Sequence, residues 1–466
     1  MNKGILSVFA SIYWTLCLAQ PDLASAILVH ESLVDPHALT IDGSFGKSIN
    51  GKSFQQDIIV SHQGYQYLCY YDAGRRVCIS RRQLPEGEWE TIHFSDYNFK
   101  SNDAHNIISI GICPADGTIH LAFDHHGDTL HYRRSIMNVA SEPEKVTWNA
   151  SLFLPIQHFL QASEPIRITY PRFWQTPDGG LQFCYRRGGS GNGDRMLVDY
   201  IAGVGEWQNT RQIDSHAGVF SDEIGTSDSR CSYPNGYQYG PTGKLHTTWV
   251  WRESSQGANH DLVYLYSEDM GNSWKNNDGR RLEEPCDVNT QGSVVVAIGR
   301  DYGLMNTHGQ TIDYQGRVHV VMWHCTDASL EAAGSVAGEE RWGPPLARRY
   351  HHYWRDLQGE WQHTELPFIA GNRPKIFVDE NARLYVIFSH RDAQKQMGDL
   401  VIATADPENS WKTWEIIYEQ SGPFVNEMLA DFYRWKHEEI LSIIVQEFPQ
   451  KSHDPTPLKV LDFKFE

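Results

Sequence analysis

The sequence is poor in basic residues, in regularly spaced cysteines and in long apolar runs. Its 40 lysines and arginines against 58 aspartates and glutamates give a formal net charge of −18. A field of this sign repels nucleic acid and anionic membrane surfaces, so neither is expected as a partner. It would also repel an anionic polysaccharide, and a site for such a substrate must therefore gather its basic residues locally.

The eight cysteines are scattered along 466 residues. This spacing does not build a compact disulfide scaffold, and most of the cysteines stand in apolar, strand-like runs where a buried free thiol is expected. Apart from the N-terminal run, no apolar stretch approaches the length of a membrane span. The chain is instead rich in aromatic residues, at 12%. These supply a large core and flat rings on which sugar faces can stack.

The N-terminus has the pattern of a secretory signal. Lys3 gives the positive start, residues 4–19 the apolar stretch, and Ala24-Ser25-Ala26 a small-residue cleavage site, with a cut after Ala19 as an alternative. A lipid anchor through Cys17 is left open, although the preceding residues make a poor lipobox. We expect residues 1–26 to be the signal and the protein to be secreted or periplasmic, an environment that permits disulfides.

One phrase recurs through the chain: a turn with glycine, then a strand of alternating apolar residues that ends in an aromatic. The period of roughly 60 to 70 residues fits four-stranded propeller blades with long loops. We therefore predict an all-β protein with a single domain, residues 27–466, folded as a seven-bladed β-propeller of four-stranded antiparallel blades. The copies lie at residues 64–70, 116–123, 178–185, 242–249 and 315–323, with weaker ones at 381–388 and 438–445.

Residues 267–274, SEDMGNSW, match the S-x-D-x-G-x-x-W turn known as the Asp-box. Ser and Asp side chains cap such a hairpin and the Trp plugs into the blade, so the motif marks a fold and not a catalytic centre. We expect the ring to close where residues 57–60 meet the C-terminal strands at 459–465.

Four polar side chains beside strand-like runs carry the chemistry. His105, His125, Tyr170 and Arg186 stand in the segments NDAHN, AFDHH, ITYPR and FCYRR. Cleavage of a uronic-acid polysaccharide by β-elimination needs a base for the C5 proton, an acid for the departing O4, and donors that neutralise the carboxylate. Two imidazoles, a phenol and a guanidinium meet these needs, and arginine fits a carboxylate as a bidentate fork.

The order, local motifs and spacing of these residues resemble the propeller-type polysaccharide lyases with BNR (Asp-box) repeats. That group comprises ulvan lyases and L-rhamnose-α-1,4-D-glucuronate lyases, and it has related propeller α-L-rhamnosidases. The resemblance implies that His105 works on the C5 proton and that Tyr170 is its acid/base partner. It implies that His125 and Arg186 hold the carboxylate.

Each of these residues also has a structural alternative. His105 can satisfy the loop that follows Asp103, and Tyr170 can be a structural tyrosine at a strand edge. Either His125 or the adjacent His126 can be the buried hydrogen-bonding residue.

Arg186 and Arg187 alternate on a strand, so only one of them can point into a shared site. Arg187 and His126 are nevertheless retained as substrate-binding candidates, together with His308, which can line the axis or the floor of the site.

The expected chemistry requires no cofactor. A structural Ca²⁺ or Zn²⁺ is left unassigned, and its ligands are unknown. The polar loop with Asp222, Glu223, Asp228 and Arg230 lacks the spacing of a calcium loop. Cys286, His324 and Cys325 likewise lack the spacing of a zinc site.

The sequence thus predicts a secreted polysaccharide lyase, a monomer that cleaves rhamnose–glucuronate linkages in ulvan or in arabinogalactan of the gum arabic type. An α-L-rhamnosidase-type hydrolase on the same propeller is the alternative. The related rhamnosidases are thought to use a histidine near the first strand, whereas residues 50–57 here contain none. A non-catalytic sugar-binding propeller is a further alternative. A sialidase is the least favoured, because only the Asp-box supports it.

Overall fold

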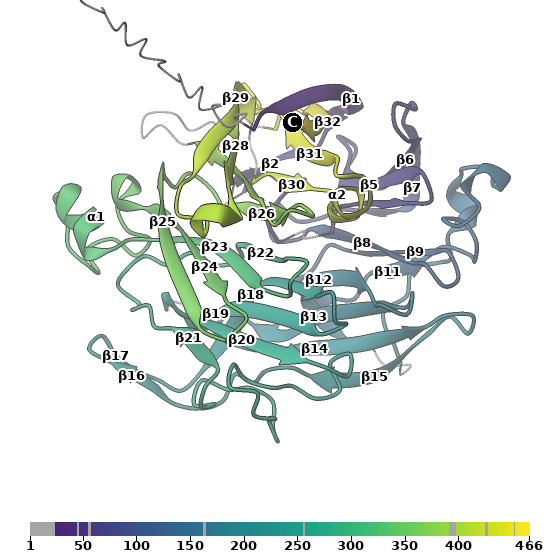
Figure 1. Ribbon diagram of the computed structural model, residues 1–466. Coiled ribbons are helices and arrows are strands. Elements are labelled where there is room, and N and C mark those ends of the chain that lie inside the picture. The colour runs from purple at the N-terminus through teal and green to yellow at the C-terminus, as the bar shows by residue number, and fades with distance from the viewer. Residues whose placement is uncertain are drawn as a thin grey trace, which may run out of the picture.

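The computed structural model describes residues 24–466 except 44–45, 55–56, 162–164, 255–256, 391–397, 425–426 and 452. Strands dominate this part of the chain (Figure 1), and both of its α-helices, α1 (Asp327–Ala332) and α2 (Phe432–Glu438), are short. The all-β prediction is therefore confirmed. None of the described helices has the length and apolar character of a membrane span. The expected signal segment lies outside the described residues as far as residue 23.

Most strands form antiparallel sheets with their neighbours in sequence. Three sheets hold four consecutive strands each. The first contains β4 (Ile59–His62), β5 (Tyr65–Tyr71), β6 (Arg76–Gln83) and β7 (Glu90–Asn98), and the second contains β22 (Gly309–Ile312), β23 (Val318–His324), β24 (Arg349–Arg355) and β25 (Trp361–Ile369). The third contains β26 (Lys375–Val378), β27 (Leu384–His390), β28 (Gly398–Ala405) and β29 (Glu415–Phe424). A three-stranded sheet contains β8 (Ile108–Cys113), β9 (Thr118–Phe123) and β11 (Tyr132–Arg134). Two short hairpins pair β2 (Thr40–Gly43) with β3 (Gly46–Ser48) and β16 (Phe220–Asp222) with β17 (Gly225–Ser227).

A nine-stranded sheet occupies the middle of the chain. It contains β10 (His126–Thr129), β12 (Arg167–Gln175), β13 (Leu181–Gly189), β14 (Asn192–Ile201), β15 (Glu206–Gln212), β18 (Arg230–Tyr239), β19 (Leu245–Glu253), β20 (Asn259–Ser267) and β21 (Val294–Val296). Its two halves are joined by a single parallel pair, Gly193 in β14 with Cys231 in β18. All its other pairings are antiparallel.

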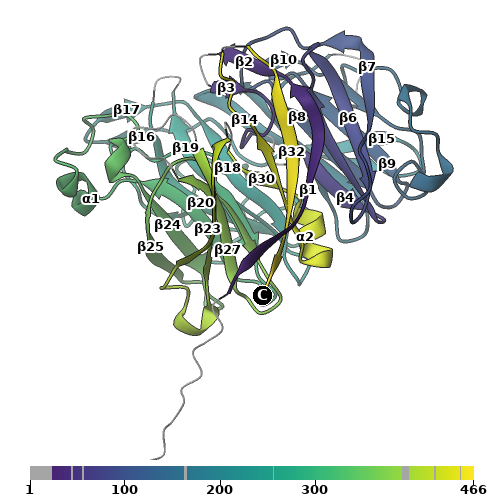
Figure 2. The same ribbon diagram turned by 90° about the horizontal axis from the view of Figure 1, so that it is seen from above.

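The two ends of the described chain meet in one further four-stranded sheet. It is ordered β1 (Ala26–Ala38), β32 (Thr456–Phe465), β31 (Leu441–Gln446) and β30 (Leu429–Ala430). Figure 2 shows the purple β1 alongside the yellow β32, with Ala26 opposite Phe465. The expected closure through residues 57–60 is wrong, because Ile59 and Val60 belong to β4 and pair with β5. β1 is longer than β4 and therefore offers more backbone hydrogen-bonding partners to β32.

The turns of the repeat follow the sequence prediction. Gly117 in the β8–β9 hairpin has a φ of +64°, a conformation that side chains with a Cβ rarely adopt. In the Asp-box, the hydroxyl of Ser267 donates to Asp269 at 2.8 Å and accepts from the amide of Gly271 at 2.7 Å. Trp274 is buried. The motif therefore caps a hairpin and anchors it in the core, as expected.

The first strands of successive sheets pack against one another. β8 lies against β4 and β12, and β22 lies against β18 and β26. The approach is close, because a Cβ on Gly111 of β8 would come within 2.5 Å of Phe173 of β12. Because the first strands lie side by side, the chain segments that lead into them lie together at one end. The segments that follow these strands lie together at the other end.

Candidate functional site

The candidate site lies where chain segments enter the first strands. His105 immediately precedes β8, Tyr170 lies in the first half of β12, and Tyr233 lies near the start of β18. Phe54 precedes β4 and Arg373 precedes β26. Ring contacts and ion–ring contacts join these side chains, although they are far apart in sequence.

Asp103 holds two histidines in fixed orientations. Nδ1 of His105 donates to its Oδ1 at 2.5 Å, and Nδ1 of His126 donates to its Oδ2 at 2.7 Å. The two imidazole rings stack with centroids 4.3 Å apart. Because Nδ1 carries the proton in each ring, Nε2 is the nitrogen of His105 that can accept one.

The electrostatics of this group favour a neutral His105. Burial lowers the pKa of His105, the hydrogen bond with Asp103 opposes this, and the neighbouring His126 lowers the pKa further. For Asp103, burial alone would raise the pKa, but the hydrogen bonds from the two histidines outweigh burial and hold its pKa well below the usual range. A neutral imidazole oriented by a carboxylate is the arrangement of a general base.

Tyr170 sits at an irregularity of its strand. Its φ is +53°, and the register between β12 and β13 shifts between Thr169 and Arg172. Such bulges re-aim a side chain and are frequent at functional sites. The ring stacks on Phe54 with centroids 4.7 Å apart and planes at 8°. Burial, aided by Tyr233, raises the pKa of Tyr170 well above its ordinary value, so the phenol keeps its proton.

Arg186 and Arg187 point in opposite directions, as strand alternation predicts. Arg186 is buried, and its guanidinium lies 4.8 Å from the ring centre of Tyr170. Its Nη1 contacts Sγ of Cys231 at 3.4 Å, and its Nε has no hydrogen-bond partner among the described residues. Arg187 is exposed and pairs with Asp194 at 3.3 Å. Of the two, Arg186 is therefore the arginine that lies beside Tyr170 and has an unpaired donor, its Nε.

The structure sets the two adjacent histidines apart. His126 is half-buried beside His105, whereas His125 is fully buried and its Nε2 accepts from the amide of His131 at 2.8 Å. Burial lowers the pKa of His125 well below its usual value. The geometry therefore places His126, and not His125, in the pair bridged by Asp103.

His308 is also fully buried. Its Nε2 accepts from the amide of Trp323 at 3.2 Å, and its carbonyl accepts from Lys375 at 2.9 Å. Its side chain thus lies in the core and accepts from the backbone of β23.

Sequence reasoning missed three members of the site. Arg373 lies over Phe54 at 5.0 Å and also pairs with Glu427. Nothing in the local sequence around Phe54 or Arg373 signals a site. Tyr233 could have been found, because its segment Ser232-Tyr233-Pro234 repeats the Thr-Tyr-Pro pattern of Tyr170 one structural repeat later.

Depressions flank the site. One of about 320 Å³ is lined by Asp103 and His126 together with Lys100 and Asp124. A second, of about 710 Å³, runs past Gly127, Arg167 and Arg187 beside β13. Both adjoin residues of the site, so an extended chain could pass across it.

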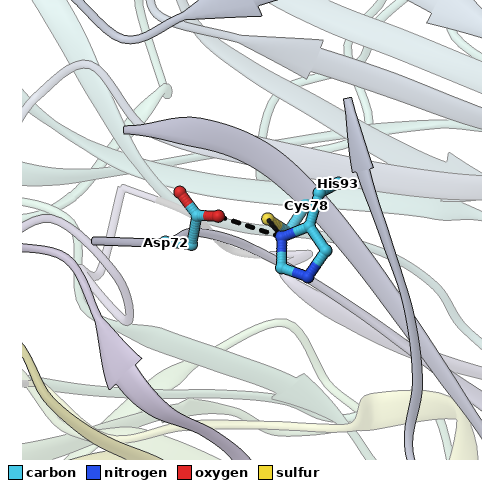
Figure 3. A group of neighbouring side chains, drawn as sticks. All are labelled: Asp72, Cys78 and His93. Carbon is cyan, nitrogen blue, oxygen red and sulfur yellow. Dashed lines mark hydrogen bonds and ion pairs between the residues drawn. The ribbon is translucent and has the colours of Figure 1, made fainter. Parts of the chain in front are cut away.

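Within the described part of the chain, two groups of side chains have donor atoms close enough to one another to hold a metal ion. One is Asp103, His105 and His126 in the site itself. The other is Asp72, Cys78 and His93 (Figure 3), where Nδ1 of His93 lies 2.9 Å from Asp72 and 3.1 Å from Cys78. Arg76 also binds Asp72 at 2.6 Å, and a cation there competes with a metal for the carboxylate.

The metal candidates named from the sequence do not assemble among the described residues. Asp222 pairs with Arg300 and Arg230 pairs with Glu253. Cys286 and Cys325 are buried free thiols.

The fold and the site together define an all-β protein of packed sheets with a buried His–Tyr–Arg constellation at one end of its first strands. Residues 65–369 match the family model described as "BNR repeat-containing family member". The chain belongs to this family, and the resemblance inferred from its sequence is confirmed.

Curated relatives are ulvan lyases. The long isoform of an Alteromonas species is 23% identical over 365 residues, which cover 67% of this chain and 34% of that protein. The long isoform of Glaciecola sp. (strain KUL10) is 24% identical over 412 residues, covering 74% and 38%. The chain thus spans little more than a third of the length of these relatives.

Solved structures share the fold. The polysaccharide lyase Uly1 superposes with a TM-score of 0.73 at 18% identity, covering 94% of this chain and 99% of Uly1. An ulvan lyase bound to -[GlcA(1-4)Rha3S]- gives a TM-score of 0.67 at 13% identity, covering 92% and 95%.

Proposed function

We propose that the protein is a polysaccharide lyase that cleaves a rhamnose–glucuronate linkage in an ulvan-type glycan by β-elimination. The observation that carries the proposal is the neutral, carboxylate-oriented His105 beside a protonated Tyr170 and a buried arginine whose Nε has no partner among the described residues. The similarity to ulvan lyases supports the substrate class.

In the proposed reaction, Arg186 neutralises the uronate carboxylate and so makes the C5 proton more acidic. We assign to His126, which contacts Asp103 beside His105, the carboxylate-holding role that the family resemblance implied for His125. Nε2 of His105 takes the proton as the C5–H bond breaks, and the electron pair forms the C4=C5 double bond. The C4–O4 bond breaks, and O4 takes its proton from Tyr170. No water is consumed.

The phenol of Tyr170 is suited to the acid role because burial keeps it protonated at neutral pH. Its ring stacks on Phe54 and contacts the guanidinium of Arg186, and these contacts hold it in place. Fixed reacting groups lower the entropic part of the barrier.

We further propose that the sheets form a seven-bladed propeller. Dividing the nine-stranded sheet at its single parallel pair, Gly193 with Cys231, gives seven sheets of three to five strands. The sheet that joins β1 with β32 would then be the blade that closes the ring. A secreted or periplasmic monomer is consistent with the N-terminal sequence.

The test compares products from ulvan, gum arabic and a neutral glycan. Elimination yields a fragment with an unsaturated uronate, which absorbs in the ultraviolet and is one water lighter than the hydrolysis product in mass spectra. We expect such products from ulvan. Saturated fragments from any of the glycans would show that the protein is a hydrolase and not a lyase. Unsaturated products from gum arabic alone would show that the substrate is arabinogalactan and not ulvan. Binding of a glycan without cleavage would show that the protein is a non-catalytic sugar-binding protein.

A further inference from the structure

A further cavity, distinct from the two depressions beside the site, has a volume of about 580 Å³ and lies at the opposite end of the first strands from His105. Pro114, which follows β8, lines it, whereas His105 precedes β8. The last residues of β12, Trp174 and Gln175, line it as well, together with α2. Its volume is in the range of about 300–1,000 Å³ that is usual for small-ligand sites.

Buried cations face this cavity. Arg172 is 3% exposed, and its Nη2 donates to the carbonyl of Pro234 at 3.3 Å. Its Nε and Nη1 have no hydrogen-bond partner among the described residues. Lys375, 8% exposed, donates to the carbonyl of His308 at 2.9 Å. A buried guanidinium with unmet donors is costly, and an anion placed between it and the ammonium would offset that cost.

The charge balance of the lining is opposite to that of the whole chain. Arg172, Lys375 and Lys436 line the cavity, and Asp57 is its one carboxyl group among the described lining residues. Asp57 is already engaged by the amide of Phe173 at 3.1 Å. Burial raises the pKa of Asp57 to about 7 although Arg172 and Lys375 lower it in part, and burial together with Arg172 lowers the pKa of Lys375 to about 7. One carboxyl group thus faces two buried cations, which leaves a place for a second anion.

The rest of the wall offers flat rings and an amide. Trp174 stacks on Tyr237 with centroids 4.4 Å apart and planes at 9°, and both line the cavity. The side-chain nitrogen of Gln175 is buried without a partner in the described structure. Aromatic faces beside amide and guanidinium donors suit a sugar ring, which has apolar faces and polar edges.

We propose that this cavity binds a small sugar bearing an acid group, a carboxylate or a sulfate ester, with the acid group held by Arg172 and Lys375. The site is separate from the His105 constellation and does not depend on the proposed reaction. The shared chemistry is a singly charged oxyanion on a pyranose ring.

The test is calorimetric titration of the full chain carrying Arg186→Gln, so that binding at the other end is suppressed. The ligands are glucuronate, a sulfated rhamnose, rhamnose and inorganic sulfate. One equivalent of glucuronate or sulfated rhamnose should bind, with affinity at least about tenfold higher than for rhamnose or inorganic sulfate, because charged hydrogen bonds and ring contacts add. Equal binding of inorganic sulfate would reduce the site to a plain anion site and overturn the sugar assignment.

Substitutions then locate the binding. Arg172→Gln and, as a milder change in the wall, Gln175→Leu should each weaken it, the former by at least about tenfold. His105→Asn, at the other end, should leave it unchanged. No binding to the Arg186→Gln chain, or binding unaffected by both wall substitutions, would overturn the proposal. Absence of lyase activity in the unsubstituted chain, with this binding present, would count against the proposed function only.

Discussion

Oδ1 of Asp103 lies 2.5 Å from Nδ1 of His105, and the same carboxylate binds His126 through its other oxygen. One acidic side chain therefore fixes the tautomer and the orientation of two imidazoles, one from the loop before β8 and one from β10. This relationship makes Asp103 a positioning residue whose role can be measured apart from its contribution to folding.

Asp103→Asn should lower kcat/KM by about 100-fold or more, because an amide cannot hold the same tautomer of His105. The hydrogen bond with Asp103 raises the pKa of His105, so its loss should also move the acid limb of the kcat/KM profile to lower pH. A purely structural role would not shift this limb. Asp261→Asn is the matched control: Asp261 accepts from His260 at 2.9 Å, and the change should leave the profile in place.

The pH dependence should show an acid limb without an alkaline one near neutrality. His105 must be neutral to accept a proton, and burial lowers its pKa below the usual value of about 6.5. Activity should therefore be present above that pKa and be lost as the pH falls through it. Tyr170 must be protonated, and its pKa is raised well above 10. An alkaline loss of kcat/KM between pH 7 and about 9 would contradict Tyr170 as the acid.

Arg186→Lys should reduce kcat/KM by about 100-fold, because an ammonium cannot hold a carboxylate bidentately. Arg187→Lys should change it by less than about threefold, since Arg187 is exposed and makes a surface ion pair with Asp194. The pair is a matched comparison of neighbouring residues on one strand. Equal losses in the two variants, measured at subsaturating substrate, would remove Arg186 from carboxylate binding.

Substitution of His125 should mainly affect stability, whereas substitution of its neighbour His126 should mainly affect activity. His125→Ala removes the acceptor for the amide of His131 in a fully buried position, and we expect it to lower the free energy of unfolding by about 1–3 kcal/mol. His126→Ala should change stability by less than about 1 kcal/mol but reduce activity by at least about tenfold. Thermal denaturation and initial rates on both variants test this. A stable His125→Ala protein without activity would restore the role first predicted for His125.

Much of the fold could be predicted because it follows from neighbours in sequence. Alternating apolar residues define strands, Gly117 supplies the left-handed turn, and the Asp-box caps its hairpin through Ser267 and Asp269. The partner of a terminal strand is not set by such local rules. We therefore predicted from local patterns that residues 57–60 pair with the C-terminal strands, whereas the structure pairs β32 with β1.

For the site, the sequence by itself determined the residue types and the opposite directions of Arg186 and Arg187, because alternation is a property of any strand. Only the tertiary structure decided which of His125 and His126 contacts Asp103, because that contact depends on how the chain leaves β9 and meets Asp103 from the loop before β8.

Phe54 and Arg373 were likewise beyond the reach of the sequence. They enter the site from segments that precede β4 and β26. Phe54 reaches Tyr170, and Arg373 reaches Phe54, only because the first strands pack side by side. Local patterns record contacts between residues a few positions apart, whereas a constellation assembled from several loops depends on how whole sheets pack. That packing is set by buried side chains spread over the entire chain.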